Sequence, residues 1–256
     1  MCYFLSALIL PSSEIVCDPE HTDSHEDLID SRGLSDSGRG EFVRVAFVPP
    51  NHESFSDPAT YTLRVDNDVR PEWFTEALER HVTVMLRDRI SRMIVLNERK
   101  ILLGGCWIAG KTARIAKLQG GKIVILAGGT VNEVWAGGRV NEVWDGGTVN
   151  KIGAGGMVNE VLAGGTVDEI GAGGTVNEVG DGGIVNKVLA GGRVNEVWDG
   201  GRVNEVWDGG TVNRIGAGGM VNEVLGGGAV NKVWDGGRVN KVWDGGRVVH
   251  DYRRSK

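Results

Sequence analysis

One segment of the chain matches a nucleotide-binding pattern in every specified position. Residues Gly105 to Thr112 read Gly-Cys-Trp-Ile-Ala-Gly-Lys-Thr, which fits the phosphate-loop pattern G-x4-G-K-[ST]. In such a loop the backbone amides and Lys111 would hold phosphate oxygens, and Thr112 would hold Mg²⁺. The pattern requires a long helix after it, yet a glycine pair returns at Gly120-Gly121 and no later apolar strand ends in an acidic metal ligand. We therefore expect a chance match to a short pattern and no nucleotide cofactor.

A second group of residues could hold a transition metal. Cys17, His21 and His25 lie close together in the sequence, with Glu20 and Asp23 among them. Their spacing is not a standard zinc pattern, and the segment around them is rich in polar residues and glycine. We expect a solvated tail here and no metal site.

No arrangement of the Ser/His/Asp or Cys/His kind is visible either. All the histidines lie outside the complete repeats described below: His21, His25, His52, His81 and His250. The sequence therefore predicts no catalytic residue, and we expect the chain not to be an enzyme.

A nine-residue repeat determines where any functional side chain lies in the second half of the chain. The unit Gly-Gly-x-Val-Asn-(Glu/Lys)-Val-x-x occurs thirteen times between Gly128 and Asp244, and a further unit starts at Gly245. We number its positions 1 to 9 from the first glycine. A fixed short period over about half of a chain is typical of a solenoid, in which each rung stacks on the one before it.

The pattern within one unit separates inside from outside. Position 4 is Val in every unit, and position 7 is Val or Ile in every complete unit, whereas position 6 is always Glu, Lys or Arg. Positions 4 and 7 are therefore predicted to point inward and position 6 outward. Because residues i and i+2 share a face in a plain strand, a bend is needed between positions 4 and 7. Asn at position 5 is the predicted bend, since Asn tolerates left-handed backbone, and the Gly-Gly pair is predicted to form the second bend.

Two units per turn is the smallest coil that can enclose a filled core. In every second unit, position 6 reads Glu133, Lys151, Glu169, Lys187, Glu205, which would stack opposite charges on neighbouring rungs. The alternation stops at Glu223, and three units per turn remains the alternative.

The period and the paired glycines resemble the calcium-binding nonapeptide repeats of secreted toxins. Those repeats require Gly at position 4 and Asp at position 6. This chain has Val at position 4, and its position 6 includes Lys151, Lys187, Lys232 and Lys241. Calcium needs several converging oxygen ligands, so we expect folding without calcium.

Position 8 carries the largest side chains of the repeat. It is Trp in six of the complete units and Leu or Gly in the other seven. Gly153 occupies this position one unit after Trp144, which would leave a large void in a core, so we expect position 8 at the surface. Among the complete units, Arg at position 3 occurs only in units with Trp. Either Arg stacks on Trp, or whole unit types were copied together. The candidate interaction surface consists of Arg139, Trp144, Arg193, Trp198, Arg202, Trp207, Trp234, Arg238 and Trp243.

The rest of the chain is predicted to be a disordered segment and a small cap. Residues 1–40 are expected to be disordered, because Pro11 to Gly40 have few apolar groups. Residues 41–103 are predicted to form an α+β cap, with strands from Phe42 and from Tyr61, a helix from Pro71 to about Ser91 on an apolar stripe that includes Met85, and strands leading into the coil. The solenoid is predicted over 104–249, followed by a charged tail over 250–256.

Composition limits the function. The net charge of −6 is unlike a nucleic-acid-binding protein, and Cys2, Cys17 and Cys106 are too scattered for a disulfide framework. The apolar run from Phe4 to Leu10 has no Lys or Arg before it and is short for a signal core, so we expect a cytoplasmic location. No later stretch could span a membrane.

The Gly-Gly-x-Val-Asn-x-Val units, with their Gly-Gly-x-Trp entry at Gly104 to Trp107, resemble uncharacterised repeat proteins of bacteria and phages. The resemblance covers about Leu102 to Val248 and implies a β-solenoid with no enzymatic residue to carry over. The glycine-paired repeats of bacterial autotransporter adhesins are a more distant likeness and imply adhesion. We therefore expect a structural or protein-interaction module. The alternative is a surface protein that binds a protein or carbohydrate partner through the exposed Trp and Arg residues.

Overall fold

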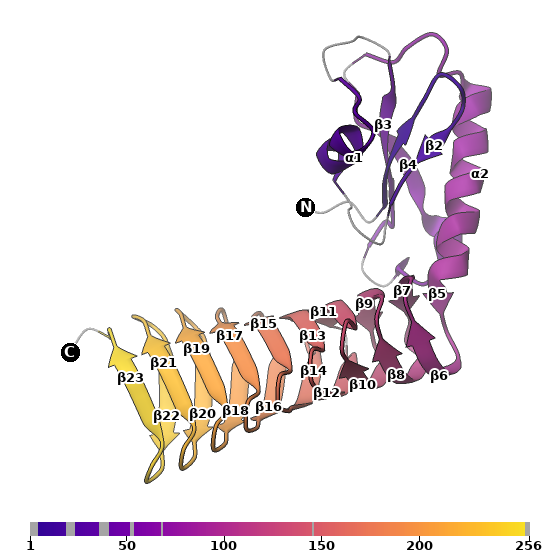
Figure 1. Cartoon of the computed structure of the whole chain (residues 1–256). Coiled ribbons are helices and arrows are strands. Elements are labelled where there is room, and N and C mark those ends of the chain that lie inside the picture. The colour runs from indigo at the N-terminus through magenta and orange to yellow at the C-terminus, as the bar shows by residue number, and fades with distance from the viewer. Residues whose placement is uncertain are drawn as a thin grey trace. The chain divides into compact units, whose positions relative to one another are not determined.

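The computed structural model describes residues 5–18, 24–35, 41–51, 54–67, 69–144 and 146–253, without the side chains of residues 125 and 126. The chain divides into two compact units, Met1–Ile94 and Val95–Lys256 (Figure 1). No helix in the described residues is both long and apolar enough to cross a membrane.

The N-terminal unit contains an antiparallel sheet with strand order β2-β1-β3-β4. Its elements are β1 (Leu5–Ile9), β2 (Ile15–Val16), α1 (His25–Ser31), β3 (Val43–Val48), the 3-10 helix η2 (Pro58–Thr60) and β4 (Thr62–Val65). The strands predicted from Phe42 and Tyr61 are confirmed as β3 and β4.

The described part of residues 1–40 differs from the predicted disorder. Every residue of β1 is buried, and β1 pairs with both β2 and β3. Leu8 of β1 belongs to the same buried cluster as Leu28 and Ile29 of α1. The polar composition of the segment concealed a short apolar strand that becomes stable only within the sheet.

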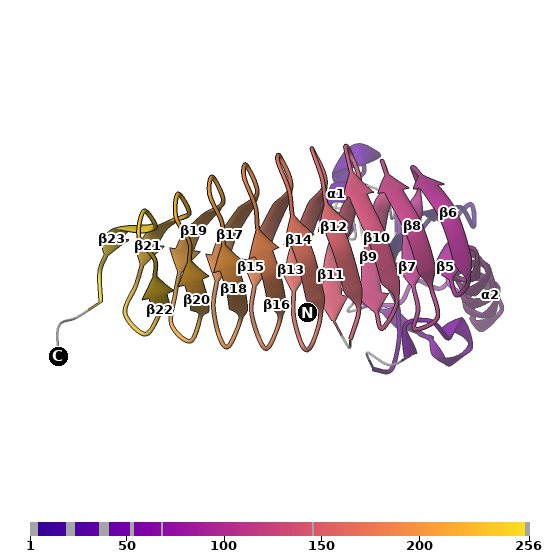
Figure 2. The same ribbon diagram turned by 90° about the horizontal axis from the view of Figure 1, so that it is seen from below.

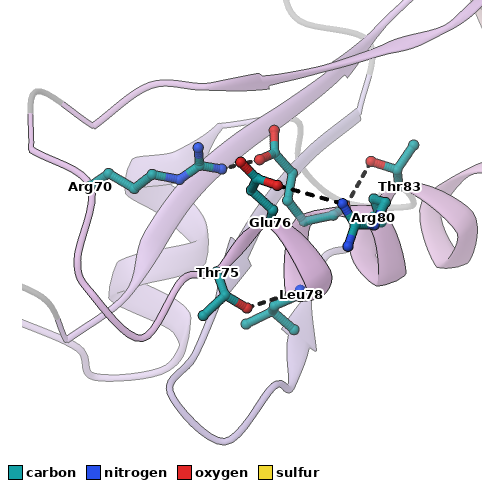
Figure 3. Close-up of polar contacts among 7 residues, drawn as sticks. Arg70, Thr75, Glu76, Leu78, Arg80 and Thr83 are labelled. Carbon is teal, nitrogen blue, oxygen red and sulfur yellow. Dashed lines mark hydrogen bonds and ion pairs between the residues drawn. The ribbon is translucent and has the colours of Figure 1, made fainter.

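Helix α2 (Glu76–Met93) begins later than predicted. Thr75 is its N-cap, and its hydroxyl accepts a hydrogen bond from the Leu78 amide at 3.3 Å (Figure 3). Pro71 instead precedes the helix, where its carbonyl accepts a turn bond from Phe74. The buried stripe consists of Val82, Leu86, Ile90 and Met93. The prediction for Met85 is wrong, because its side chain lies outside this stripe and is 46% exposed.

The C-terminal unit is a β-solenoid with two parallel sheets (Figure 2). The ten-stranded sheet contains β5 (Ile94–Val95), β7 (Cys106–Ala109), β9 (Lys122–Ala127), β11 (Arg139–Trp144), β13 (Met157–Val161), β15 (Thr175–Val179), β17 (Arg193–Val197), β19 (Thr211–Ile215), β21 (Ala229–Val233) and β23 (Arg247–Asp251). The nine-stranded sheet contains β6 (Glu98–Leu103), β8 (Arg114–Gln119), β10 (Thr130–Trp135), β12 (Thr148–Ile152), β14 (Thr166–Ile170), β16 (Ile184–Val188), β18 (Arg202–Val206), β20 (Met220–Val224) and β22 (Arg238–Val242).

The strand register confirms two units per turn. Val140 of β11 pairs with Val158 of β13, two units later, and the same offset joins the strands that follow. The coil also starts before the predicted boundary at Gly104, because β5 and β6 already belong to its two sheets. The residues between 94 and 103 are therefore its first rung.

The interior of the coil is a closed stack of Val and Ile. Positions 4 and 7 are fully buried from Val131 to Val233, as the inward assignment of these positions predicts. The pairing of neighbouring strands skips position 5, for example between Val149 and Lys151. The backbone therefore changes direction at position 5, and both flanking apolar residues point inward.

Asn at position 5 produces this bend without left-handed backbone. None of the described Asn residues has a positive φ. The Asn side chains instead bond to one another along the coil, so that each carboxamide donates to the Asn one rung before it. On the ten-stranded sheet, the bonds run from Asn195 to Asn177 at 2.9 Å and from Asn213 to Asn195 at 2.8 Å. The predicted left-handed bend is thus replaced by an Asn ladder on each sheet.

The two glycines of each corner have different roles. Gly182, at position 1, has φ +84°, which only glycine adopts without strain. Gly183, at position 2, has an ordinary φ, but a Cβ there would lie 1.9 Å from the Val161 carbonyl oxygen of the preceding rung. The Gly-Gly pair therefore forms the second bend, with positive φ at position 1 and close approach between rungs at position 2.

Asp168 interrupts the Asn ladder of the nine-stranded sheet. It accepts a bond from Asn186 at 2.8 Å, but a carboxylate has no proton to donate to Asn150 on the rung before. We expect Asp168→Asn to complete the ladder and to raise the free energy of unfolding by about 1 kcal/mol. Urea denaturation of both proteins measures the difference. Asn204→Asp, which would interrupt the same ladder at another rung, is the control and should lower stability.

Candidate interaction surface

The outward side chains of the coil form two faces, one on each sheet. We call the outward positions of the ten-stranded sheet, from β11 to β23, the ten-strand face. Those of the nine-stranded sheet, from β10 to β22, are the nine-strand face. The predicted surface residues are divided between them. Arg139, Trp144, Arg193, Trp198 and Trp234 belong to the ten-strand face, and Arg202, Trp207, Arg238 and Trp243 belong to the nine-strand face. The structure therefore does not gather them into one patch.

The Trp side chains lie over the charged position 6. The indole N–H of Trp198 donates to the Glu196 carboxylate at 2.8 Å, and Trp207 makes the same bond to Glu205. Trp207, Trp234 and Trp243 are 42–44% exposed, as expected for a surface position. Trp144 is different, at 9% exposed.

Two of the four glycines at position 8 lie against a Trp ring from the preceding rung. A Cβ at Gly216 would lie 2.1 Å from the ring of Trp198, and a Cβ at Gly153 would lie 2.7 Å from the ring of Trp135. The exchange of Trp for Gly at this position is therefore a packing relation between rungs. Reading position 8 in every second unit would have found it in the sequence.

The cations that contact these rings come from position 6. Arg214 lies between two indoles, with its guanidinium carbon 4.4 Å from the ring centre of Trp198 and 5.4 Å from that of Trp234. Trp234 in turn stacks on Tyr252 at 5.0 Å. In the described part of the chain, none of the position-3 Arg residues takes part in such a contact. Of the two alternatives, this favours the copying of whole unit types over the stacking of Arg on the Trp of its own unit.

The nine-strand face alternates in charge, as the spacing of every second unit predicts. Glu133, Lys151, Glu169, Lys187 and Glu205 follow one another in register. Lys151 and Glu169 form an ion pair at 3.5 Å. Each of these carboxylates therefore has an opposite charge one rung away.

The ten-strand face instead separates its charges into two blocks. Glu142, Glu160, Glu178 and Glu196 occupy position 6 of four successive rungs, and Arg214, Lys232 and His250 occupy the next three. Glu196 and Arg214 form an ion pair at 3.4 Å where the blocks meet. A shallow groove runs along the acidic block, lined by Asn and Glu of β13, β15 and β17.

The acidic block is electrostatically unfavourable for its own fold. Burial raises the pKa of Glu178, and the nearby carboxylates of Glu160, Glu196 and Asp199 raise it further. A raised carboxyl pKa means that the ionised form is disfavoured in the folded protein. This repulsion among carboxylates was not predicted from the sequence. Position 6 in every second unit from Glu142 would have indicated it, because Glu occurs there in four successive rungs.

The segment that matches a phosphate loop lies within the coil. Gly105 to Thr112 contains β7 and the turn before β8, so a strand follows where a phosphate loop requires a helix. The Thr112 hydroxyl donates to the Leu96 carbonyl oxygen.

The candidate metal group is only partly described. His21 lies outside the described residues, and His25 contacts the Val45 carbonyl oxygen at 2.9 Å through its ring Nε2. The described residues contain no cluster of three metal-ligating side chains.

One pocket of the N-terminal unit contains a thiol and an imidazole that the sequence analysis did not bring together. Cys17 and His81 line it, with Met85 and Arg89. Burial raises the pKa of the Cys17 thiol, although Arg89 opposes this effect. The thiol is therefore mostly protonated at neutral pH, whereas a nucleophilic cysteine is a thiolate.

Comparison with protein-family models and with curated protein sequences gives no match. Among solved structures, a hyper-glycosylated fragment of TibA, residues 55–350, modified by TibC, aligns with 62% of this chain and 90% of its own. The two are 18% identical, with a TM-score of 0.29, which is too low to bear on fold or function.

Proposed function

We propose that this chain is a non-enzymatic β-solenoid module with a structural or protein-binding role. The observation that supports the proposal is the construction of the coil. Its interior is a closed stack of fully buried Val and Ile, so a substrate has no space inside it. Its outward positions form columns of charged and aromatic side chains with a regular spacing of about 4.8 Å between rungs. Such columns suit the binding of an extended partner surface.

Nucleotide binding is the activity that would contradict this proposal most directly. We expect titration with ATP and Mg²⁺ to give no saturable binding by calorimetry and no shift in melting temperature. A micromolar affinity that is lost in Lys111→Ala would overturn the proposal, because it would show a working phosphate loop in the first rungs.

A second candidate function is carbohydrate binding through exposed Trp. Trp207 supports it, because its ring is 42% exposed. On a glycan array, this candidate predicts binding that is lost in Trp207→Gly. Trp198→Gly is the control, because Arg214 already occupies the ring of Trp198. Absence of glycan binding by the wild type would leave the structural or protein-binding role.

A further inference from the structure

The two faces of the coil differ in how their charges are arranged along the rungs. Like charges on neighbouring rungs lie about 4.8 Å apart and destabilise a sheet. Four carboxylates are stacked in this way from Glu142 to Glu196, followed by Arg214, Lys232 and His250. On the nine-strand face, alternation already neutralises the charges from Glu133 to Glu205. The ten-strand face instead carries two blocks of opposite sign, which meet in the ion pair between Glu196 and Arg214.

We propose that the ten-strand face binds the same face of a second copy of this chain, with the two coils antiparallel. The two-fold axis would run along the strand direction, between the rungs of Glu196 and Arg214. This inference rests on the proposed function, and it names the partner of that module.

The symmetry operation pairs opposite charges at two successive rungs and places a carboxylate opposite an imidazole at the next. Rotation about the strand direction keeps each position of the repeat opposite itself and reverses the order of the rungs. Glu196 then faces Arg214 of the second copy, and Glu178 faces Lys232. On the outermost rungs, Glu160 faces His250. Each contact occurs twice, as a two-fold axis requires.

The size of the overlap predicts a weak, salt-sensitive dimer. Six overlapping rungs, β13 to β23, span about 29 Å, and a five-residue strand spans about 16 Å, which gives a footprint of about 500 Å² per copy. Standard stable interfaces bury about 800 Å² per partner. Charge pairing at the edge of such an interface weakens as salt increases.

Sedimentation equilibrium of the full chain over a range of protein concentrations tests the proposal. We expect a monomer–dimer equilibrium at low salt whose dissociation constant rises in high salt. Glu178→Lys would face Lys232 of the second copy, and Lys232→Glu would face Glu178. Each variant alone should therefore raise the dissociation constant about tenfold or more. Glu169→Lys, on the nine-strand face, makes the same change in net charge as Glu178→Lys and should leave dimerisation unchanged.

A mixture of the two single variants is the decisive sample. A heterodimer of Glu178→Lys with Lys232→Glu carries opposite charges in both contacts, so the mixture should recover dimers that neither variant forms alone. A monomer at every concentration and salt would overturn the inference, and so would a dimer or polymer that is indifferent to these variants. Either result would leave the non-enzymatic module in place, whereas ATP binding dependent on Lys111 would sink the proposed function and not the dimer.

Discussion

Val203→Asp is expected to lower the free energy of unfolding of the solenoid by about 4 kcal/mol or more. Val203 is fully buried, and it stacks in register between Val185 and Val221. The interior is only as wide as the inward residues of two sheets, so a carboxylate at this position could not reach water without opening the rung. Because neighbouring rungs share this interior, the damage should extend along the coil.

Trp207→Gly is the matched comparison, four residues along the same rung. It removes a half-exposed ring and the bond from the indole to Glu205, and should cost about 1–2 kcal/mol. Urea denaturation followed by circular dichroism compares the two variants. Equal losses of stability would contradict the assignment of position 4 to the interior and position 8 to the surface.

Gly183→Ala is expected to destabilise the coil by about 3 kcal/mol or more, since no small adjustment relieves the clash. Its new Cβ would lie 1.9 Å from the Val161 carbonyl oxygen, which is backbone, and 2.4 Å from the carbonyl carbon. The two rungs would have to separate at that corner, and separation weakens the adjacent ladder bonds, such as that from the Ile184 amide to the Gly165 carbonyl.

Gly182→Ala is the control at the adjacent residue. A Cβ at Gly182 would meet its nearest atom at 4.0 Å, so only the positive φ opposes Ala, at about 1–2 kcal/mol. Thermal unfolding of both variants separates the effect of space from the effect of backbone conformation. If Gly182→Ala were the more damaging change, close packing between rungs would not be the reason for glycine at position 2.

The sequence was sufficient to predict the coil and its register. A nine-residue period with invariant Val at position 4 identifies the inward residues, and the alternation from Glu133 to Glu205 indicates two units per turn. Both are properties of a repeated unit, so each copy supports the same interpretation. The first rung was missed because residues 94–103 precede the regular repeat.

Contacts between rungs were harder to predict, because they join residues two units apart. Asn at position 5 suits a bend when one unit is considered alone, and its ladder emerges only when Asn195 is placed beside Asn177. The seat of Trp198 on Gly216 and the position of Arg214 between two rings have the same origin. In the N-terminal unit, the strand Leu5–Ile9 was missed because its stability comes from pairing with a strand that lies more than thirty residues further along the chain.

The interior of the coil is the same in every unit, whereas its outward faces vary. The number of units can therefore change without changing the interior. The sequence from Arg139 to Ala163 recurs from Arg202 to Gly226 with changes only at Lys151, which becomes Arg214, and at the last residue. The first copy begins on β11 of one sheet, and the second begins on β18 of the other. A block of an odd number of units can therefore be inserted with its core and its Asn ladder intact, while its outward side chains move to the opposite face. Each duplicated pair of units lengthens such a coil by about 4.8 Å. Whether the number of inserted units is odd or even decides which face carries each charge.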